Sequence, residues 1–381
     1  MTTVPATGVE KRLWTSSAGR AREVDEGMSV PIPWKPVAIV STLTTALLSL
    51  LLLPACCCMR TKSASTAVSP QTVQAQIGLG SIPTPTEAQS KAPTQIAMRN
   101  VWFHIDQQAY LDIHELRGEL VSKELGAPVN FDNKLTFVLK IDTGTIGMKS
   151  ASLDILMNRY VFGYPGAPLR DLQVTTSGQQ LRLEGIIHKI VDLPFVMHAD
   201  VSASNGKIRI HPTKIDLCGV NGLGLLKAIG QSLEKMLKLP AERGVVAEVN
   251  DMLLDPVKIL PPPTVEMKLV AVRVEGDELI QIVDAGRGLS PLRPPREVPN
   301  YLYLRGGTLR LGKLLMVDAD LETVDADPSD PFDFFIDRYN DQLVAGFSRN
   351  TVDYGLIATM RDFSDLGAPP RPGESVPPDQ H

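Results

Sequence analysis

The sequence predicts an α+β fold built on a mainly antiparallel sheet, and three observations indicate it. Apolar and polar residues alternate over residues 135–141 and 193–202, which is the period of strands with one buried face. Asn205-Gly206, between two alternating segments, is a strong signal for a two-residue hairpin turn. Residues 150–162 instead carry apolar side chains at steps of three and four, as an amphipathic helix does. The alternating strands together offer a longer apolar face than a compact core needs.

Composition and charge limit the classes of partner. The chain has 381 residues and a formal net charge of −5, so it lacks the basic field of nucleic-acid-binding proteins, and we expect no nucleic-acid partner. Hydrophobic residues make up 43% of the chain and aromatic residues only 5%, so aliphatic side chains must line most of the core. Cys56, Cys57 and Cys58 are adjacent and Cys218 is isolated, a distribution that cannot form a disulfide framework.

An uncharged apolar segment, residues 37–59, is long enough to cross a hydrocarbon core of about 30 Å. We predict either a membrane-spanning anchor or a signal peptide that starts at the internal Met28. In the second interpretation, Leu53-Pro54-Ala55-Cys56 resembles a bacterial lipoprotein cleavage box, with Cys56 as the lipidation candidate. Lysines and arginines are more numerous before the segment than just after it, which places the N-terminus in the cytoplasm. The bulk of the chain is therefore expected outside, on the periplasmic side of an inner membrane or as a lipoprotein.

Composition also divides the chain into regions. Residues 1–36 show no periodicity and are predicted to be disordered, and residues 60–97, rich in Ser, Thr, Gln, Ala and Pro, are predicted to be a flexible linker. Residues 98–290 are predicted to form one domain, which residues 291–366 complete with further strands and a helix. Residues 367–381 are Pro-rich and polar and are predicted to be a disordered tail.

The first half of the folded part is predicted to consist mostly of strands, at residues 101–105, 109–123, 134–142, 171–175, 180–188, 193–202 and 207–211. Helix and strand patterns compete over residues 109–123, and we favour the strand because Gly118 interrupts a helix. The helix at 150–162 has Ser150 or Ser152 as its cap and ends at Gly163.

The second half is predicted to mix helices and hairpins. A long apolar helix is expected at residues 222–239 and another at 243–254. After an extended segment at Pro261-Pro262-Pro263, strands are expected at residues 268–274, 278–283, 300–304, 308–311 and 314–318, with a loop of Gly, Pro and Arg at 285–299. Pro331 is predicted to begin a final helix, with Ser329 or Asp330 as its cap.

Signals for chemistry are weak. One group of polar residues matches no metal-binding spacing and is interpreted as solvent-facing strand positions: His104, Asp106, Asp112, His114 and Glu115. The glycines before residue 225 fit close packing better than phosphate binding. The acidic residues between Asp325 and Asp337 are interpreted as capping and solubilising groups, with calcium binding as the alternative. No nucleophile elbow is present, so we predict no catalytic residue, metal ion or cofactor and favour a non-enzymatic role.

The order of elements over residues 133–283, about half the chain, resembles the tubular lipid-binding (TULIP-like) superfamily. That superfamily includes the bactericidal/permeability-increasing proteins and the synaptotagmin-like lipid-transfer domains, and the likeness is greatest to bacterial, membrane-attached members. The progression that carries it runs from Arg159-Tyr160-Val161-Phe162-Gly163-Tyr164-Pro165-Gly166-Ala167-Pro168 through the Asn205-Gly206 hairpin to Pro261-Pro262-Pro263. The resemblance implies a strongly curved, mainly antiparallel sheet wrapped around a long amphipathic helix, with an apolar groove for acyl chains.

We therefore expect a membrane-tethered, extracytoplasmic lipid-binding or lipid-carrying protein, whose partners are lipid or fatty acyl chains and the membrane. A phospholipase-like lipid hydrolase and an envelope scaffold that binds a partner protein remain alternatives. Each buried methylene contributes about 0.8 kcal/mol, so an acyl chain can bind without a polar site. The alternation predicts that the groove is lined by Phe137, Leu139, Ile155, Met157, Phe195, Met197, Leu226 and Leu233.

Overall fold

The structure of the chain is a computed structural model that describes residues 84–188, 191–224, 232–237, 239, 241–353 and 355–375. These residues belong to one compact unit, Pro70–His381. The predicted anchor at 37–59, the lipidation candidate Cys56 and the N-terminal segment 1–36 lie outside the described residues. Among the residues that are described, no helix has the length and apolar character needed to cross a membrane.

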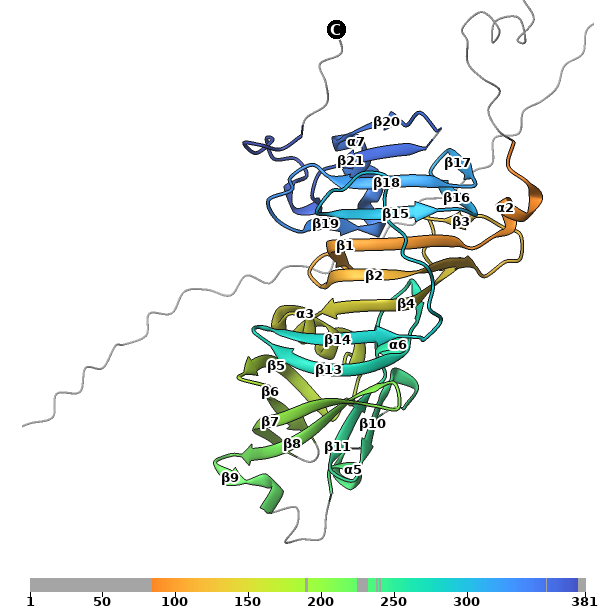
Figure 1. The fold of residues 1–381 in the computed structure, drawn as a ribbon. Coiled ribbons are helices and arrows are strands. Elements are labelled where there is room, and N and C mark those ends of the chain that lie inside the picture. Colours follow the sequence, from red (N-terminus) through yellow and green to blue (C-terminus); the bar gives the residue numbers. More distant parts are fainter. Residues whose placement is uncertain are drawn as a thin grey trace, which may run out of the picture. The chain divides into compact units, whose positions relative to one another are not determined.

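The largest sheet has 11 strands and is organised around β1, Thr94–His104. β1 pairs antiparallel with β2, Tyr110–Ser122, and β2 pairs antiparallel with β4, Phe137–Gly147. The sheet continues from β4 to β14 and β13, and from β1 in the other direction to β15, β18, β21 and β20 (Figure 1). β12 beside β4, β19 beside β1 and β21 beside β18 are parallel pairs. These strands are β12 Thr264–Glu266, β13 Leu269–Glu275, β14 Glu278–Asp284, β15 Tyr301–Arg305, β18 Asp320–Asp325, β19 Phe332–Phe335, β20 Phe347–Asn350 and β21 Leu356–Met360.

A second sheet has 7 strands in the order β10-β11-β8-β7-β6-β5, with β9 paired to β8. Asn205 and Gly206 join β7 to β8, and their φ angles of 51° and 75° are those of a type I′ turn. The predicted hairpin is therefore confirmed. The strands are β5 Leu169–Ser177, β6 Gln180–His188, β7 Asp192–Ser204, β8 Lys207–Leu217, β9 Val220–Asn221, β10 Val245–Glu248 and β11 Asp251–Leu254. A third sheet, β17-β16-β3, consists of Leu314–Val317, Thr308–Leu311 and Val129–Asn130.

The described helices are short. They are α2 Glu87–Lys91, α3 Ser150–Ile155, α5 Leu233–Met236, α6 Pro256–Ile259 and α7 Tyr339–Ala345, with 3-10 turns at Ala241–Arg243, Ile336–Arg338 and Phe363–Asp365. α3 continues into a π-helical segment, Leu156–Val161, so the predicted helix at 150–162 is confirmed. Its predicted cap is wrong, because Lys149 is at the N-cap position and no side chain caps the helix.

One connected cluster of buried apolar side chains runs through the two larger sheets. β13 lies close to β7 and β8, so the edge of the main sheet adjoins the second sheet. The fold is therefore α+β with mainly antiparallel sheets, as predicted, and its core is mostly aliphatic.

The predicted helix at 222–239 is interrupted. Ser232 is extended, with φ −132° and ψ 165°, and its hydroxyl caps the short helix α5, so a continuous helix cannot pass through it. Residues 225–231 lie outside the described residues. A long helix enclosed by a curved sheet is thus not seen in the part of the chain that the structure describes.

Two further helix predictions are wrong. Residues 243–254 form the hairpin of β10 and β11, whose turn holds Val249 at φ 56°. This hairpin adds to β8, so sheet pairing prevails over the helical spacing of its apolar residues. Pro331 does not begin a helix either, because Phe332–Phe335 is the strand β19 and all four residues are buried. The helix α7 begins only at Tyr339.

The folded part extends beyond both predicted boundaries. Thr86 forms a capping box with Gln89 at the start of α2, inside the predicted linker, and β1 begins before residue 98. At the other end, Glu374 forms an ion pair with Arg361, and both side chains are largely buried. The Ser375 amide donates to the Ala326 carbonyl at 2.7 Å, so the fold reaches into the predicted tail.

Candidate functional site

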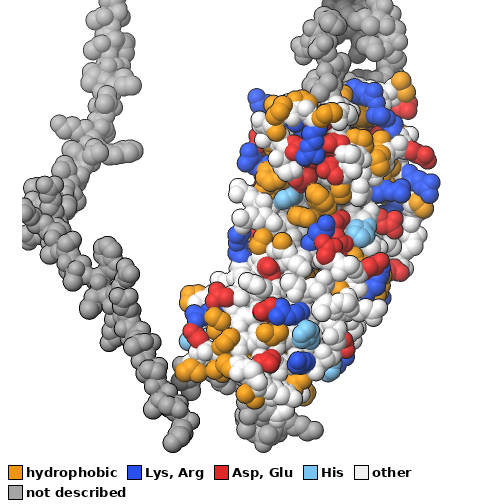
Figure 2. All heavy atoms as spheres, turned by 90° about the vertical axis from the view of Figure 1, so that its left-hand side faces the viewer, with side chains coloured by type: hydrophobic (Ala, Val, Ile, Leu, Met, Phe, Trp, Pro, Cys, Tyr) orange, Lys and Arg blue, Asp and Glu red, His pale blue; other side chains and the backbone are white. Residues whose placement is uncertain are grey.

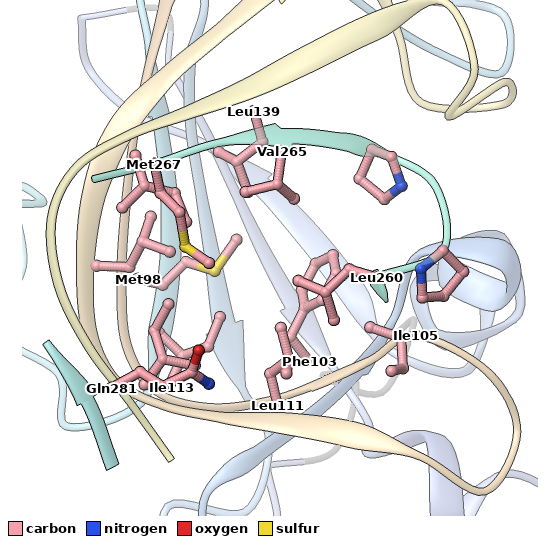
Figure 3. Close-up of a pocket in the computed structure, with 15 residues that line it drawn as sticks. Met98, Phe103, Ile105, Leu111, Ile113, Leu139, Leu260, Val265, Met267 and Gln281 are labelled. Atoms are coloured by element: carbon pink, nitrogen blue, oxygen red, sulfur yellow. The ribbon is translucent and has the colours of Figure 1, made fainter. Parts of the chain in front are cut away.

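An apolar slot lies between the core-facing side of the main sheet and the segment 260–267, which we call the lid (Figure 3). The sheet contributes side chains from β1, β2, β4 and β14, and the lid covers them. The lining residues are Met98, Phe103, Ile105, Leu111, Ile113, Leu116, Leu139, Ile141, Ile146, Leu260, Pro261, Pro263, Val265, Met267 and Gln281. All but Gln281 are apolar.

Irregularities in the strands β1 and β2 determine which side chains line the slot. Asn100 has φ 53°, a conformation that asparagine tolerates better than most residues. It interrupts the alternation of β1, and the β2–β4 register shifts between Ile113 and Glu115. As a result Met98 and Phe103 face the same slot although strict alternation would separate them.

The lid is attached to the sheet through β12, which pairs in parallel with residues 138–140 of β4. Prolines precede it, and they cannot donate backbone hydrogen bonds. Two surface contacts also hold the lid: Lys123 Nζ donates to Thr264 Oγ1 at 2.9 Å, and Lys140 Nζ lies 3.2 Å from Glu266 Oε2. Exposed contacts of this kind contribute roughly 0–1 kcal/mol each, so the lid is held mainly by its β12 pairing and by its buried side chains, Pro263 and Val265.

Gln281 supplies the polar group of the slot (Figure 3). Its side chain is 3% exposed, and its Oε1 has no hydrogen-bond partner among the described residues. An amide can both accept and donate hydrogen bonds. Leaving such a buried acceptor unpaired costs about 1–3 kcal/mol, a cost that a ligand with a hydrogen-bond-donating end would remove.

The slot is narrow. Its free volume is about 30 Å³, room for about two water molecules. Cavities that take up a small aromatic ligand are several times larger, at about 150 Å³. An acyl chain therefore does not fit the slot in this closed form.

A second apolar slot of about 30 Å³ lies inside the second sheet, against α5, β10 and β11. Five of the eight predicted groove residues line a slot: Leu139 lines the first, and Met157, Phe195, Met197 and Leu233 line the second. Phe137 and Ile155 line neither slot. Phe137 is 1% exposed and stacks on Phe131 in the core, and Ile155 is partly buried. Leu226 and Cys56 lie outside the described residues.

The outer surface offers less to an apolar ligand. On the face shown in Figure 2, basic and acidic side chains are interspersed, and apolar side chains occur in small groups. An apolar ligand would thus find more contact in the slots than on this face.

Asp112 and His114, interpreted above as solvent-facing, meet Glu278 of β14. His114 Nε2 lies 3.2 Å from Glu278 Oε2 and 3.9 Å from Asp112 Oδ1, and the Trp102 indole donates to Asp112 Oδ2 at 3.0 Å. Burial and the Asp112 carboxylate raise the pKa of Glu278. The three groups are close enough to hold a divalent cation. The solvent-facing interpretation is wrong for Asp112, which is buried, and right for His114.

His104 is also buried and pairs with Asp333, its Nε2 lying 2.6 Å from Asp333 Oδ1. The acidic run contains a second cluster, because Asp325 and Asp330 meet Asp362. Burial raises the pKa of Asp325 to about 7 and that of Asp362 to about 8. A purely solubilising role is therefore wrong for Asp325 and Asp333, which are both buried.

The glycines before residue 225 have a packing role where the structure shows one. A side chain at Gly222 would meet the side chains of Ile215 and Leu217 at 3.0 Å. This contact favours the packing interpretation.

The sequence alone does not indicate Gln281 and the lid as parts of a site, because only the pairing of distant strands brings them to the slot.

A comparison of the chain with protein-family models, with curated proteins and with solved structures finds no match.

Proposed function

We propose that this protein binds lipid, taking up an acyl chain in the apolar slot beneath the lid, and that it does so outside the cytoplasm while tethered to a membrane by residues 37–59. The observation that supports this most is the composition of the slot. Fourteen apolar side chains surround it, and a single buried amide with an unpaired oxygen supplies its polar group. This combination suits a ligand with a long apolar body and one hydrogen-bond-donating end, such as a protonated acid or a hydroxyl group.

The energetics of opening are compatible with this role. The lid is held by a three-residue strand pairing, two exposed polar contacts and the burial of its apolar side chains, Val265 above all; the polar contacts are worth little in water, and a bound acyl chain would cover the apolar side chains again. An acyl chain gains about 0.8 kcal/mol for each buried methylene, so a chain of moderate length offsets the lost lid contacts. The lid is therefore the moving part, and the strands β1, β2 and β4 are the fixed wall.

The experiment uses the full-length protein in phosphatidylcholine vesicles that contain a photoactivatable fatty acid. After irradiation, mass spectrometry maps the cross-linked peptides. We expect cross-links in peptides that cover residues 98–116 and 260–267. Ile141→Trp, which fills the slot from β4, should remove them, whereas Val270→Trp, on the exposed side of β13, should leave them.

Cross-links confined to residues 37–59 would contradict the proposal, as would cross-links that both tryptophan variants retain. Thermal unfolding of each variant establishes that it is folded. If Ile141→Trp does not fold, Val265→Phe on the lid provides the same test from the opposite wall.

A further inference from the structure

A larger cavity of about 810 Å³ lies on the opposite face of the same strands. Its floor comes from β1, β2, β4 and β15, and its roof is the segment 285–299, which we call the strap. Charged side chains gather on both sides. The residues that line it and carry the argument are Arg99, Glu115, Arg117, Arg293, Arg296 and Glu297. We call this space the arginine chamber.

The register of the sheet places the floor side chains in two neighbouring rows. Ala97 on β1 is opposite Arg117 on β2, which in turn is opposite Thr143 on β4. In the next row, Arg99 is opposite both Glu115 and Tyr301. Because Ala97 carries only a methyl group, the floor is hollow between the longer side chains.

The strap is fixed at both ends and stands off the sheet between them. Arg287 donates from Nε to Asp142 and from Nη1 to Glu119, both at 2.9 Å. At the other end, Asn300 Nδ2 donates to Asp325 Oδ2 at 2.8 Å. The strap residues between these anchors include four prolines, which cannot donate to a neighbouring strand. The strap therefore covers the chamber without pairing with the strands beneath it.

The chamber carries an excess of positive charge. Four arginines and two glutamates line it, and within the described part of the chain none of the four arginines forms an ion pair. The Nε and Nη1 atoms of Arg117 are shielded from solvent and have no hydrogen-bond partner. Guanidinium N–H groups that lose their water without gaining an acceptor raise the free energy of the folded state, unless an anion supplies the acceptor.

We propose that the arginine chamber binds an oxyanion of the phosphate class, with Arg117 on the floor and Arg293 and Arg296 on the strap as its donors. Phosphate oxygens accept several charge-assisted hydrogen bonds at once, which matches guanidinium groups that approach from two sides. The phosphate can belong to a free anion or to the headgroup of an anionic lipid. This site lies across the sheet from the apolar slot and does not depend on acyl binding there.

The test uses the full-length protein in phosphatidylcholine nanodiscs. Inorganic phosphate and pyrophosphate are titrated in by calorimetry, and amide hydrogen exchange is followed in peptides that cover the strap. We expect pyrophosphate to bind, to slow exchange in the strap, and to bind more weakly as salt is added. Arg117→Gln should weaken binding at least about tenfold, which corresponds to the loss of one charge-assisted hydrogen bond. Arg273→Gln, on exposed β13 and paired with Glu275, is the matched control and should bind as the natural protein does.

A second arm identifies the source of the phosphate. Nanodiscs of phosphatidylcholine are compared with nanodiscs that also contain phosphatidylglycerol, with exchange in the strap as the readout. Slower exchange with phosphatidylglycerol alone, lost in Arg117→Gln, would assign the site to a lipid headgroup and still support the proposal. Arg293→Gln, at an exposed strap position, replaces Arg117→Gln if that variant does not fold. The proposal is overturned if neither anion nor phosphatidylglycerol changes the strap, or if the control variant loses binding to the same extent.

Discussion

Replacing Asp362 by asparagine should remove much of the pH dependence of the folding stability. Burial raises the pKa of Asp362 from 3.8 to about 8 and that of Asp325 to about 7, with the neighbouring carboxylates adding to the effect. The folded state therefore keeps protons that the unfolded state has released, and stability falls as the pH rises through this range. Since one unit of pKa difference corresponds to about 1.4 kcal/mol, we expect the natural protein to lose at least about 2 kcal/mol between about pH 5 and pH 8.

Asparagine has nearly the shape of the protonated acid and can still accept the hydrogen bond that the Asp333 amide donates at 2.7 Å. The assay is urea unfolding at a series of pH values, with the slope of stability against pH as the readout. Asp171→Asn, at an exposed position, is the control and should keep the slope of the natural protein. The reasoning fails if Asp362→Asn keeps the full slope, or if the stability of the natural protein rises over this pH range. A slope that disappears only when calcium is added would show that Asp325, Asp330 and Asp362 hold a cation instead.

Two further predictions concern the sheet and the slot. Gly118→Ala should lower the free energy of unfolding by about 2 kcal/mol or more in urea unfolding, because the new methyl group would lie 2.2 Å from the Lys140 carbonyl oxygen of β4. Gly224→Ala, whose nearest neighbours lie at 3.4 Å, is the control and should change it by less than about 0.5 kcal/mol. Equal losses in the two variants would contradict the packing argument. Gln281→Leu should raise the thermal midpoint of the empty protein, because it removes a buried acceptor without a partner, and a fall in the midpoint would show that the amide is bonded.

The sequence predicts elements whose signals are local. The Asn205-Gly206 turn and the helix that starts at Ser150 need only neighbouring residues, and both are found. The hairpin of β10 and β11 is different, because Val246, Val249 and Met252 also have helical spacing. Its strand form depends on β8, a partner that lies elsewhere in the sequence.

The candidate sites could be predicted less well than the local elements, because their residues also come together only through strands that are distant in the sequence. Asp112 meets Glu278 only because β4 lies between their strands and pairs with both. Arg117 and Arg293 line the same cavity only because the strap returns across the sheet. Alternation marks which residues are apolar, but the irregularity at Asn100 decides which of them face the slot.

The ion pair of Arg361 and Glu374 limits where the chain can be truncated at its C-terminal end. Arg361 also donates from Nη1 to the Ala368 carbonyl at 2.8 Å, so the last described residues supply the acceptors for a guanidinium that has little contact with water. A recombinant fragment that stops at residue 366 would keep this cation and lose its carboxylate, a change that costs about 3–5 kcal/mol in buried pairs. Expression fragments and C-terminal fusions should therefore retain the chain through Ser375.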